Sequence, residues 1–171
     1  MGLFSSRLFK KIKCRLISRL LVIKLATDED CENIYNWRNH ELNRKYSLNS
    51  EIIPWEIHQN WFKTKIRDSD SRVLIVKYLM QEVGVVIFNF EDQNSEISIY
   101  LVPGFHNKGF GLSVLYLAER WLKANHVTKN INAKIIPKNY ASISVFSEAG
   151  YLFINSEDDY QLWQRSLSNT K

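Results

Sequence analysis

The feature that most constrains the fold is an uninterrupted strand, turn and helix pattern between residues 96 and 125. The segment EISIYLV (96–102) alternates polar and apolar side chains, as a half-buried strand does. One face carries Glu96, Ser98 and Tyr100, and the intervening isoleucines and leucine form the other. The turn PGFHNKGFGL (103–112) follows, and helical periodicity then predicts a helix over about residues 111–125. This pattern predicts a sheet strand that leads directly into a helix N-terminus.

The same reasoning predicts the rest of the chain. The other predicted strands are LLVIKLA (20–26), RVLIVKYLM (72–80), VGVVIFNF (83–90), INAKII (131–136), YLFIN (151–155) and YQLWQRSL (160–167). Gln81-Glu82 is the predicted hairpin turn. One helix begins after Thr27 with a capping-box pattern, a second opens at Pro54, and a third (139–149) ends at Gly150. We therefore expect an α+β domain of about seven strands, mostly antiparallel, with one strand–helix–strand crossover.

Length and charge exclude several classes of protein. A chain of 171 residues suits one domain with a full core. All 18 acidic residues lie at or after Asp28, and the balance from residue 25 onward is 16 basic against 18 acidic side chains. The body therefore has no cationic field for nucleic acid. Two cysteines without metal or redox spacing, and no apolar run long enough to span a bilayer, favour a reduced cytoplasmic protein without a metal.

The positive charge belongs to the N-terminal segment, residues 1–19. Phe4, Leu8, Ile12 and Leu16 recur every four residues with cations between them, which is the pattern of a basic amphipathic helix. One interpretation is peripheral attachment to a membrane through residues 1–20. The other is a helical extension that packs on the domain or on a second copy of the chain. In the latter case the protein would be a homodimer. We expect residues 20–171 to form the single folded domain.

The glycine turn (residues 103–112) has the chemistry of an anion site. Glycines allow positive φ, neighbouring backbone N–H groups can point at one anion, and a helix N-terminus adds partial positive charge. A tight turn that needs only conformational freedom explains the glycines equally well. The turn lacks the spacing of a Walker A loop and the third glycine of the dinucleotide-binding fingerprint.

Two blocks in the right order resemble the acetyl-CoA core of the GNAT N-acetyltransferase superfamily. The first is the family's Arg/Gln-x-x-Gly-x-Gly/Ala turn, matched by Gly109 and Gly111 with His106 at the Arg/Gln position. The second, about 30 residues later, is NYASISVFSEAGY, which begins at Asn139. The resemblance covers roughly residues 22–167 and implies a GNAT fold with a V-shaped acetyl-CoA cleft.

The resemblance also implies the cofactor-binding residues. The glycine turn would hold the coenzyme A pyrophosphate, the backbone of the preceding strand would bind the pantetheine, and the second block would line the cofactor arm. The residues so assigned are Ile99, Tyr100, Leu101, His106, Asn107, Lys108, Gly109, Phe110, Gly111, Asn139, Ser142 and Phe146.

The N-terminal half resembles acetyltransferases that act on nucleotide-linked amino sugars, those of the pseudaminic acid pathway in particular. The pattern is Trp-Arg-Asn followed by His-x-x-Trp, in NWRNHELNRKYSLNSEIIPWEIHQNWF. Ribosomal-protein N-terminal acetyltransferases share part of it. Arg38 can grip a diphosphate with its fork, and Tyr46, His58 and Trp61 offer hydrogen bonds and stacking surfaces for a substrate. For the tryptophans at 37 and 55 we favour an ordinary core role.

Amine acetylation needs a base, a polarised carbonyl and a proton for the thiolate. Glu96 is the candidate base by resemblance, with His58 and His40 as competitors. Many superfamily members carry a tyrosine as general acid where this chain has Phe146. We therefore expect no single residue to act as an indispensable acid.

These residues lead to one main hypothesis and two alternatives. The main hypothesis is acetyl-CoA-dependent N-acetylation of an amino group on a nucleotide-activated sugar, in bacterial surface-glycan biosynthesis. The first alternative is a protein N-terminal or polyamine acetyltransferase. The second is a non-catalytic module, for which His106 and Phe146 are the departures from the family pattern.

Overall fold

Seven strands form one mixed sheet in the order β1-β2-β3-β4-β5-β7-β6 in the computed structural model, which describes residue 14 and residues 16–167. The strands are β1 (Leu21–Leu25), β2 (Ser71–Tyr78), β3 (Gln81–Glu91), β4 (Asn94–Leu101), β5 (Asn130–Ile135), β6 (Leu152–Ser156) and β7 (Gln161–Ser166). The β4–β5 pair is parallel, and the other pairs are antiparallel. This confirms the predicted mostly antiparallel sheet of seven strands.

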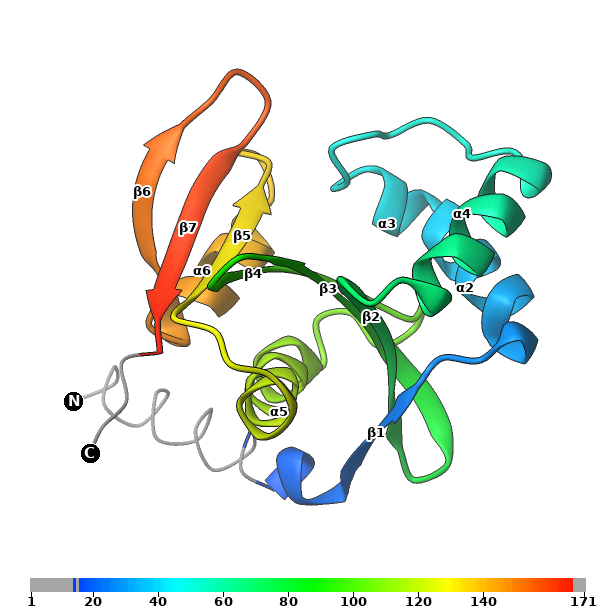
Figure 1. Cartoon of the computed structure of the whole chain (residues 1–171), viewed down its shortest axis with the longest axis horizontal. Helices are drawn as coiled ribbons and strands as arrows, with labels where there is room; N and C mark the ends of the chain where they lie inside the picture. Colours follow the sequence, from blue (N-terminus) through cyan, green and yellow to red (C-terminus); the bar gives the residue numbers. More distant parts are fainter. Residues whose placement is uncertain (1–13, 15, 168–171) are drawn as a thin grey trace.

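Helices cover both faces of this sheet (Figure 1). The helical elements are a 3-10 turn η1 (Asp28–Asp30), α2 (Cys31–Asn39), α3 (Glu41–Arg44), α4 (Trp55–Arg67), α5 (Phe110–Asn125) and α6 (Tyr140–Glu148). The predicted capping box at Thr27 is present at the start of η1. Helices α2 and α4 lie on one side of the β1–β4 half, and α5 lies on the other.

Alternation along β2 divides the core between these two layers. Val73 and Ile75 pack with the buried residues of α2 and α4. Leu74 and Val76 pack in the larger cluster beneath α5. Strands buried on both faces read as continuous apolar runs, which explains the sequence VLIV. The faces of β4 also follow the prediction, because Ile97 lies in the α5 cluster and Tyr100 packs against the α2–α4 cluster.

The structure corrects three local predictions. The β2–β3 turn lies at Leu79 and Met80, both with positive φ, and Gln81 already belongs to β3. Bulky residues disfavour that conformation. The turn was therefore predicted at the polar pair that follows, Gln81-Glu82. The connection after α2 contains the short helix α3, which periodicity did not predict. Trp55 was expected in the core and is 39% exposed.

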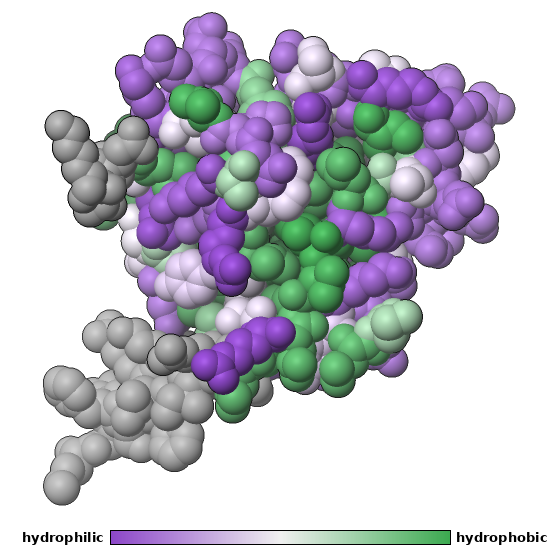
Figure 2. All heavy atoms as spheres, turned by 60° about the horizontal axis from the view of Figure 1, so that its bottom comes forward, coloured by the Kyte–Doolittle hydropathy of each residue, from purple (hydrophilic) through white to green (hydrophobic). Residues whose placement is uncertain are grey.

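The face that carries β1 and the β2–β3 hairpin has apolar side chains gathered at its surface (Figure 2). The exposed apolar residues of these elements and of the preceding helical turn are Leu16, Leu20, Val22, Leu25, Leu79 and Met80. Within the described part of the chain, no helix has the length and apolar character needed to cross a membrane. The predicted amphipathic helix falls mainly on residues 1–13, which lie outside the described residues.

Candidate active site

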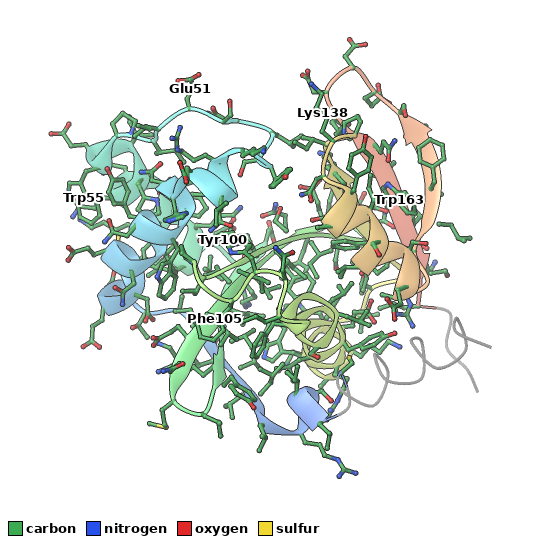
Figure 3. All side chains as sticks on the ribbon, turned by 180° about the vertical axis from the view of Figure 1, so that it is seen from behind. Glu51, Trp55, Tyr100, Phe105, Lys138 and Trp163 are labelled. Atoms are coloured by element: carbon green, nitrogen blue, oxygen red, sulfur yellow. The ribbon has the colours of Figure 1, made fainter. Side chains whose placement is uncertain are left out.

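Strands β4 and β5 pair only at their first residues. Their parallel register joins Asn94–Glu96 to Asn130–Asn132 and then stops. A cleft of about 1170 Å³ is lined by both strands, by the glycine turn and by α6. Its other side is the acceptor wall, which we define as α3, the connection to α4, and α4 itself. Figure 3 shows the opening with Glu51 of the acceptor wall on one side and Lys138 on the other. The cleft that the resemblance implied is therefore present.

Backbone geometry leaves amide groups free at the start of α5. Gly109 is the N-cap residue with φ 88°, and Asn107 also has positive φ. No side chain in the described part of the chain caps this helix. Its first N–H groups therefore remain available as hydrogen-bond donors. Gly111 has a different role, because a Cβ there would lie 3.3 Å from Val145 Cγ2 of α6. The turn thus combines free donors with the positive end of a 16-residue helix dipole.

The cleft edge of β4 offers a second set of backbone groups. Val102 donates its N–H to Val83 O at 3.0 Å, and alternate residues of an antiparallel pair point in opposite directions. The backbone groups of Ile99 and Leu101 therefore face away from β3 and toward the cleft. Those of Tyr100 face β3, so this residue contributes its side chain to the cleft.

The α6 wall carries the second sequence block. Asn139 Oδ1 accepts a hydrogen bond from Ser142 N at 3.1 Å, which caps the helix. Ser142 and Phe146 both line the cleft. Phe146 is buried and packs edge-on against Tyr151, with ring centroids 4.8 Å apart. This residue has no proton to donate, so α6 carries no tyrosine hydroxyl at that position.

Glu96 lies where β4 and β5 separate. Its Oε2 is 2.8 Å from Lys134 Nζ of β5, and both residues line the cleft. The hydrogen bond and charge of Glu96 raise the pKa of Lys134. The ammonium therefore holds one carboxylate oxygen of Glu96, and the other oxygen makes no hydrogen bond within the described residues. Lys134 was absent from the sequence-based candidates. Its alternation with the buried Ala133 and Ile135 indicates that it lies on the exposed face of β5, opposite these two residues.

Two unpartnered donors lie between β4 and the acceptor wall. Arg38, at the end of α2, donates from Nη2 to Asn49 O at 2.9 Å. Its Nη1 and the Tyr100 hydroxyl are buried and have no hydrogen-bond partner among the described residues. Burial raises the pKa of Tyr100 and lowers that of Arg38. Tyr100 lies near the centre of the molecule in Figure 3. Buried donors without partners are costly, so this pair is suited to a ligand with acceptor oxygens.

The remaining substrate candidates have different environments. Tyr46 and Trp61 line the cleft with partly exposed rings. His58 also borders it but is buried, and its Nε2 lies 3.1 Å from Cys31 O. Since a carbonyl only accepts, Nε2 carries the proton. His40 accepts a hydrogen bond from Leu42 N at the start of α3 and does not line the cleft. The geometry therefore favours Glu96 over His40 as the base.

Burial of His58 makes the protein sensitive to acid. Burial lowers the pKa of His58 from its ordinary value of 6.5, and the same cause lowers those of His106 and His126. In the unfolded chain these groups take up protons near pH 6.5, while the folded chain resists protonation, so stability falls as pH drops below that value. We expect a lower melting temperature near pH 5.5 than near pH 7.5. Thermal scans of the wild type and His58→Phe check this, because the variant should show a weaker pH dependence; an unchanged dependence would contradict the assignment.

Comparison with known proteins decides the family. Residues 19–152 match the family model described as an acetyltransferase (GNAT) domain. The chain belongs to the GNAT acetyltransferase family. An uncharacterized protein of Methanocaldococcus jannaschii is 29% identical over 135 residues, 77% of this chain, and the match spans 28% of that protein's length.

Solved structures share the GNAT fold. Spermidine N-acetyltransferase from Vibrio cholerae, in complex with CoA and spermine, superposes with a TM-score of 0.77 at 16% identity, covering 86% of this chain and 96% of that one. Campylobacter jejuni N-acetyltransferase PseH superposes with a TM-score of 0.69 at 17% identity, covering 87% and 99%.

Acetyl-CoA, the cosubstrate of GNAT enzymes, fits the groups that the cleft presents. The free amides before α5 suit its phosphates, and the cleft edge of β4 suits the amides of its pantetheine arm. The described residues hold no group of three metal-ligating side chains. His106, the residue at the Arg/Gln position of the family pattern, has its Nε2 3.1 Å from Asn43 Oδ1. Asn43 is the second site residue that the sequence did not indicate.

Proposed function

We propose that this GNAT domain transfers the acetyl group of acetyl-CoA to an amino group of a nucleotide-activated amino sugar. The setting we propose is bacterial surface-glycan synthesis. The observation that carries this proposal is the pair of unpartnered donors, Arg38 Nη1 and the Tyr100 hydroxyl, in the acceptor half of the cleft. A diphosphate linked to a sugar supplies acceptor oxygens for both, and a guanidinium is suited to such a group.

The buried guanidinium of Arg38, on the acceptor side of the cleft, supports an anionic acceptor over a polycation. The acidic lining residues are Glu51, Glu96 and Glu148, and Glu96 is already paired with Lys134. The buried guanidinium of Arg38 repels a second cation in its neighbourhood. A sugar nucleotide instead brings its negative charge to Arg38 and its amino group to Glu96.

The chain's own groups perform the rest of the reaction. Acetyl-CoA supplies a thioester, whose carbonyl is electrophilic. The backbone N–H of Ile99 faces the cleft and would polarise that carbonyl. Glu96 would accept the proton of the acceptor ammonium, directly or through water, at the oxygen that Lys134 leaves free. Phe146 cannot protonate the departing thiolate, which we expect to leave unprotonated and take its proton from water.

Release of coenzyme A tests the proposal. Wild-type protein and acetyl-CoA are mixed with one candidate acceptor at a time. The acceptors are UDP-linked amino sugars, spermidine and a peptide with a free N-terminus. The proposal predicts release that depends on a sugar nucleotide. Release with the peptide or spermidine alone would refute the sugar assignment while leaving acetyl transfer intact. Calorimetry with acetyl-CoA separates both outcomes from a non-catalytic module that has lost its cosubstrate, which would give no heat.

Arg38→Met is expected to lower kcat/KM for the acceptor by about 10- to 100-fold, because a hydrogen bond to a charged group contributes about 1.5–3 kcal/mol. The dissociation constant of acetyl-CoA should not change. Arg44→Met is the matched control, since Arg44 donates to Asn39 O and Ser50 O and orders the same connection, but has no buried nitrogen without a partner. An equal loss in both variants would mean that Arg38 acts only by holding the connection.

Tyr100→Phe is expected to leave the melting temperature unchanged or slightly higher, because it removes a buried hydroxyl without a partner. Acceptor kcat/KM should fall at least about tenfold, because a hydrogen bond to a charged phosphate oxygen contributes about 1.5–3 kcal/mol. Thermal unfolding and steady-state kinetics on the same preparation give both values. A stability loss with unchanged kinetics would place the hydroxyl in an internal hydrogen bond instead.

A further inference from the structure

Asn43 joins three parts of the site through one buried amide. The residue lies on the four-residue helix α3 and is 6% exposed. Its Nδ2 donates to Trp37 O of α2 at 2.7 Å and to Leu101 O of β4 at 3.0 Å. Its Oδ1 lies 3.1 Å from His106 Nε2 in the glycine turn. The amide therefore links the acceptor wall, the end of β4 and the glycine turn.

The two carbonyl partners fix the direction of the third bond. An amide NH₂ has two hydrogens, and a carbonyl oxygen can only accept. Nδ2 therefore uses both hydrogens on Trp37 and Leu101, and the oxygen must face the imidazole. Since that oxygen accepts, His106 Nε2 is the donor and carries the proton. In the neutral ring, Nδ1 then has the lone pair.

The free nitrogen of His106 has no partner within the described chain. Nδ1 is buried without a hydrogen bond, and the residue lines the cleft. Burial and the nearby His40 both lower the pKa of His106, so the ring stays neutral at physiological pH. A neutral imidazole lone pair repels a phosphate oxygen and accepts an N–H or O–H donor. The amide and hydroxyl groups of a pantetheine arm are such donors.

We propose that Asn43 is a positioning residue that fixes His106 as the Nε2–H tautomer and aims its Nδ1 as an acceptor for the pantetheine arm. This inference rests on the proposed use of acetyl-CoA. It assigns His106 to the pantetheine and leaves the phosphates to the amides of the turn. The Leu101 carbonyl already accepts a hydrogen bond from Asn43. The carbonyl of Ile99 is therefore the cleft-facing carbonyl of β4 that we assign to the ligand.

Nitrogen-15 NMR of the imidazoles tests the tautomer. The chain has four histidines, and the shifts of the two ring nitrogens differ between tautomers. Wild-type His106 should show the Nε2–H form, and Asn43→Ala should convert it to a mixture. Asn39→Ala is the matched control, because the Asn39 amide bonds both backbone groups of Ile53 in the same region and does not touch the turn. An Nδ1–H form in the wild type, or no change in Asn43→Ala, would overturn the assignment.

Calorimetry with two ligands tests the contact. Acetyl-CoA carries the pantetheine arm, and 3′-phosphoadenosine 5′-diphosphate carries only the nucleotide and its phosphates. His106→Leu should weaken acetyl-CoA about tenfold, and Asn43→Ala should weaken it less, about twofold for an equal mixture of the two tautomers. Both variants should leave binding of the nucleotide fragment unchanged. Equal weakening of both ligands would place His106 at the phosphates and overturn the proposal. Absence of acetyl-CoA binding in the wild type would refute the proposed function, while the NMR experiment would still decide the role of Asn43.

Discussion

Glu96→Gln is expected to lower kcat by about 10²- to 10⁴-fold, the range that a positioned general base contributes. Glutamine keeps the size of the side chain and its ability to accept a hydrogen bond, but it cannot take a proton from an ammonium. The glycine turn and the cleft edge of β4 are untouched by the change, so the dissociation constant of acetyl-CoA should stay the same. Stopped-assay kinetics with the active acceptor, and calorimetry with acetyl-CoA, measure the two quantities.

Glu82→Gln is the control for this experiment. Glu82 pairs with Lys77 at 3.1 Å, and its side chain is 31% exposed, the same as that of Glu96. It lies outside the residues that line the cleft. Removing an exposed ion pair costs little stability, so Glu82→Gln should retain wild-type kcat. Retention of full activity in Glu96→Gln would transfer the base role to another group, for which His58 is the remaining candidate on the cleft.

Gly109→Val is expected to weaken acetyl-CoA binding by at least about a hundredfold. The residue has φ 88°, a conformation that costs a β-branched side chain about 1–3 kcal/mol. Relief of that strain rotates the peptide groups before α5, which removes the convergence of their N–H donors on the phosphates. Titration with acetyl-CoA followed by calorimetry measures the loss.

Gly150→Val separates backbone strain from loss of the site. Gly150 has φ 89°, almost the same value as Gly109, and a Cβ there would meet no atom within 4 Å. It follows α6 and does not line the cleft. Both variants should lose similar stability in thermal unfolding, while Gly150→Val should keep its affinity for acetyl-CoA. Equal loss of affinity in the two variants would mean that Gly109 matters for folding alone.

The sheet and its helices were predictable because their signals are local. Alternation placed Glu96 and Tyr100 on one face of β4, and the glycine pattern placed the start of α5 within one residue. The turn at Leu79 and Met80 was missed because two bulky residues at positive φ contradict ordinary turn chemistry. Tertiary packing there outweighs the local preference.

The unpredicted site residues depend on contacts that are distant in sequence. Asn43 bonds groups that lie 6, 58 and 63 residues away along the chain. In the sequence it is one polar residue within a polar connection. Lys134 reaches Glu96 only because β4 and β5 run parallel in one particular register. Local periodicity carries no information about that register, so the ion pair could not be inferred before the topology was known.

The phenylalanine on α6 has a consequence for the choice of acyl donor. Because Phe146 packs against Tyr151 and offers no hydroxyl to the cleft, the departing sulfur would develop its full negative charge. Transfer should then depend steeply on the acidity of the thiol that leaves, more steeply than in an enzyme that protonates the sulfur as the bond breaks. In a series of acetyl thioesters, the rate of acetyl transfer by this domain should therefore rise as the pKa of the leaving thiol falls.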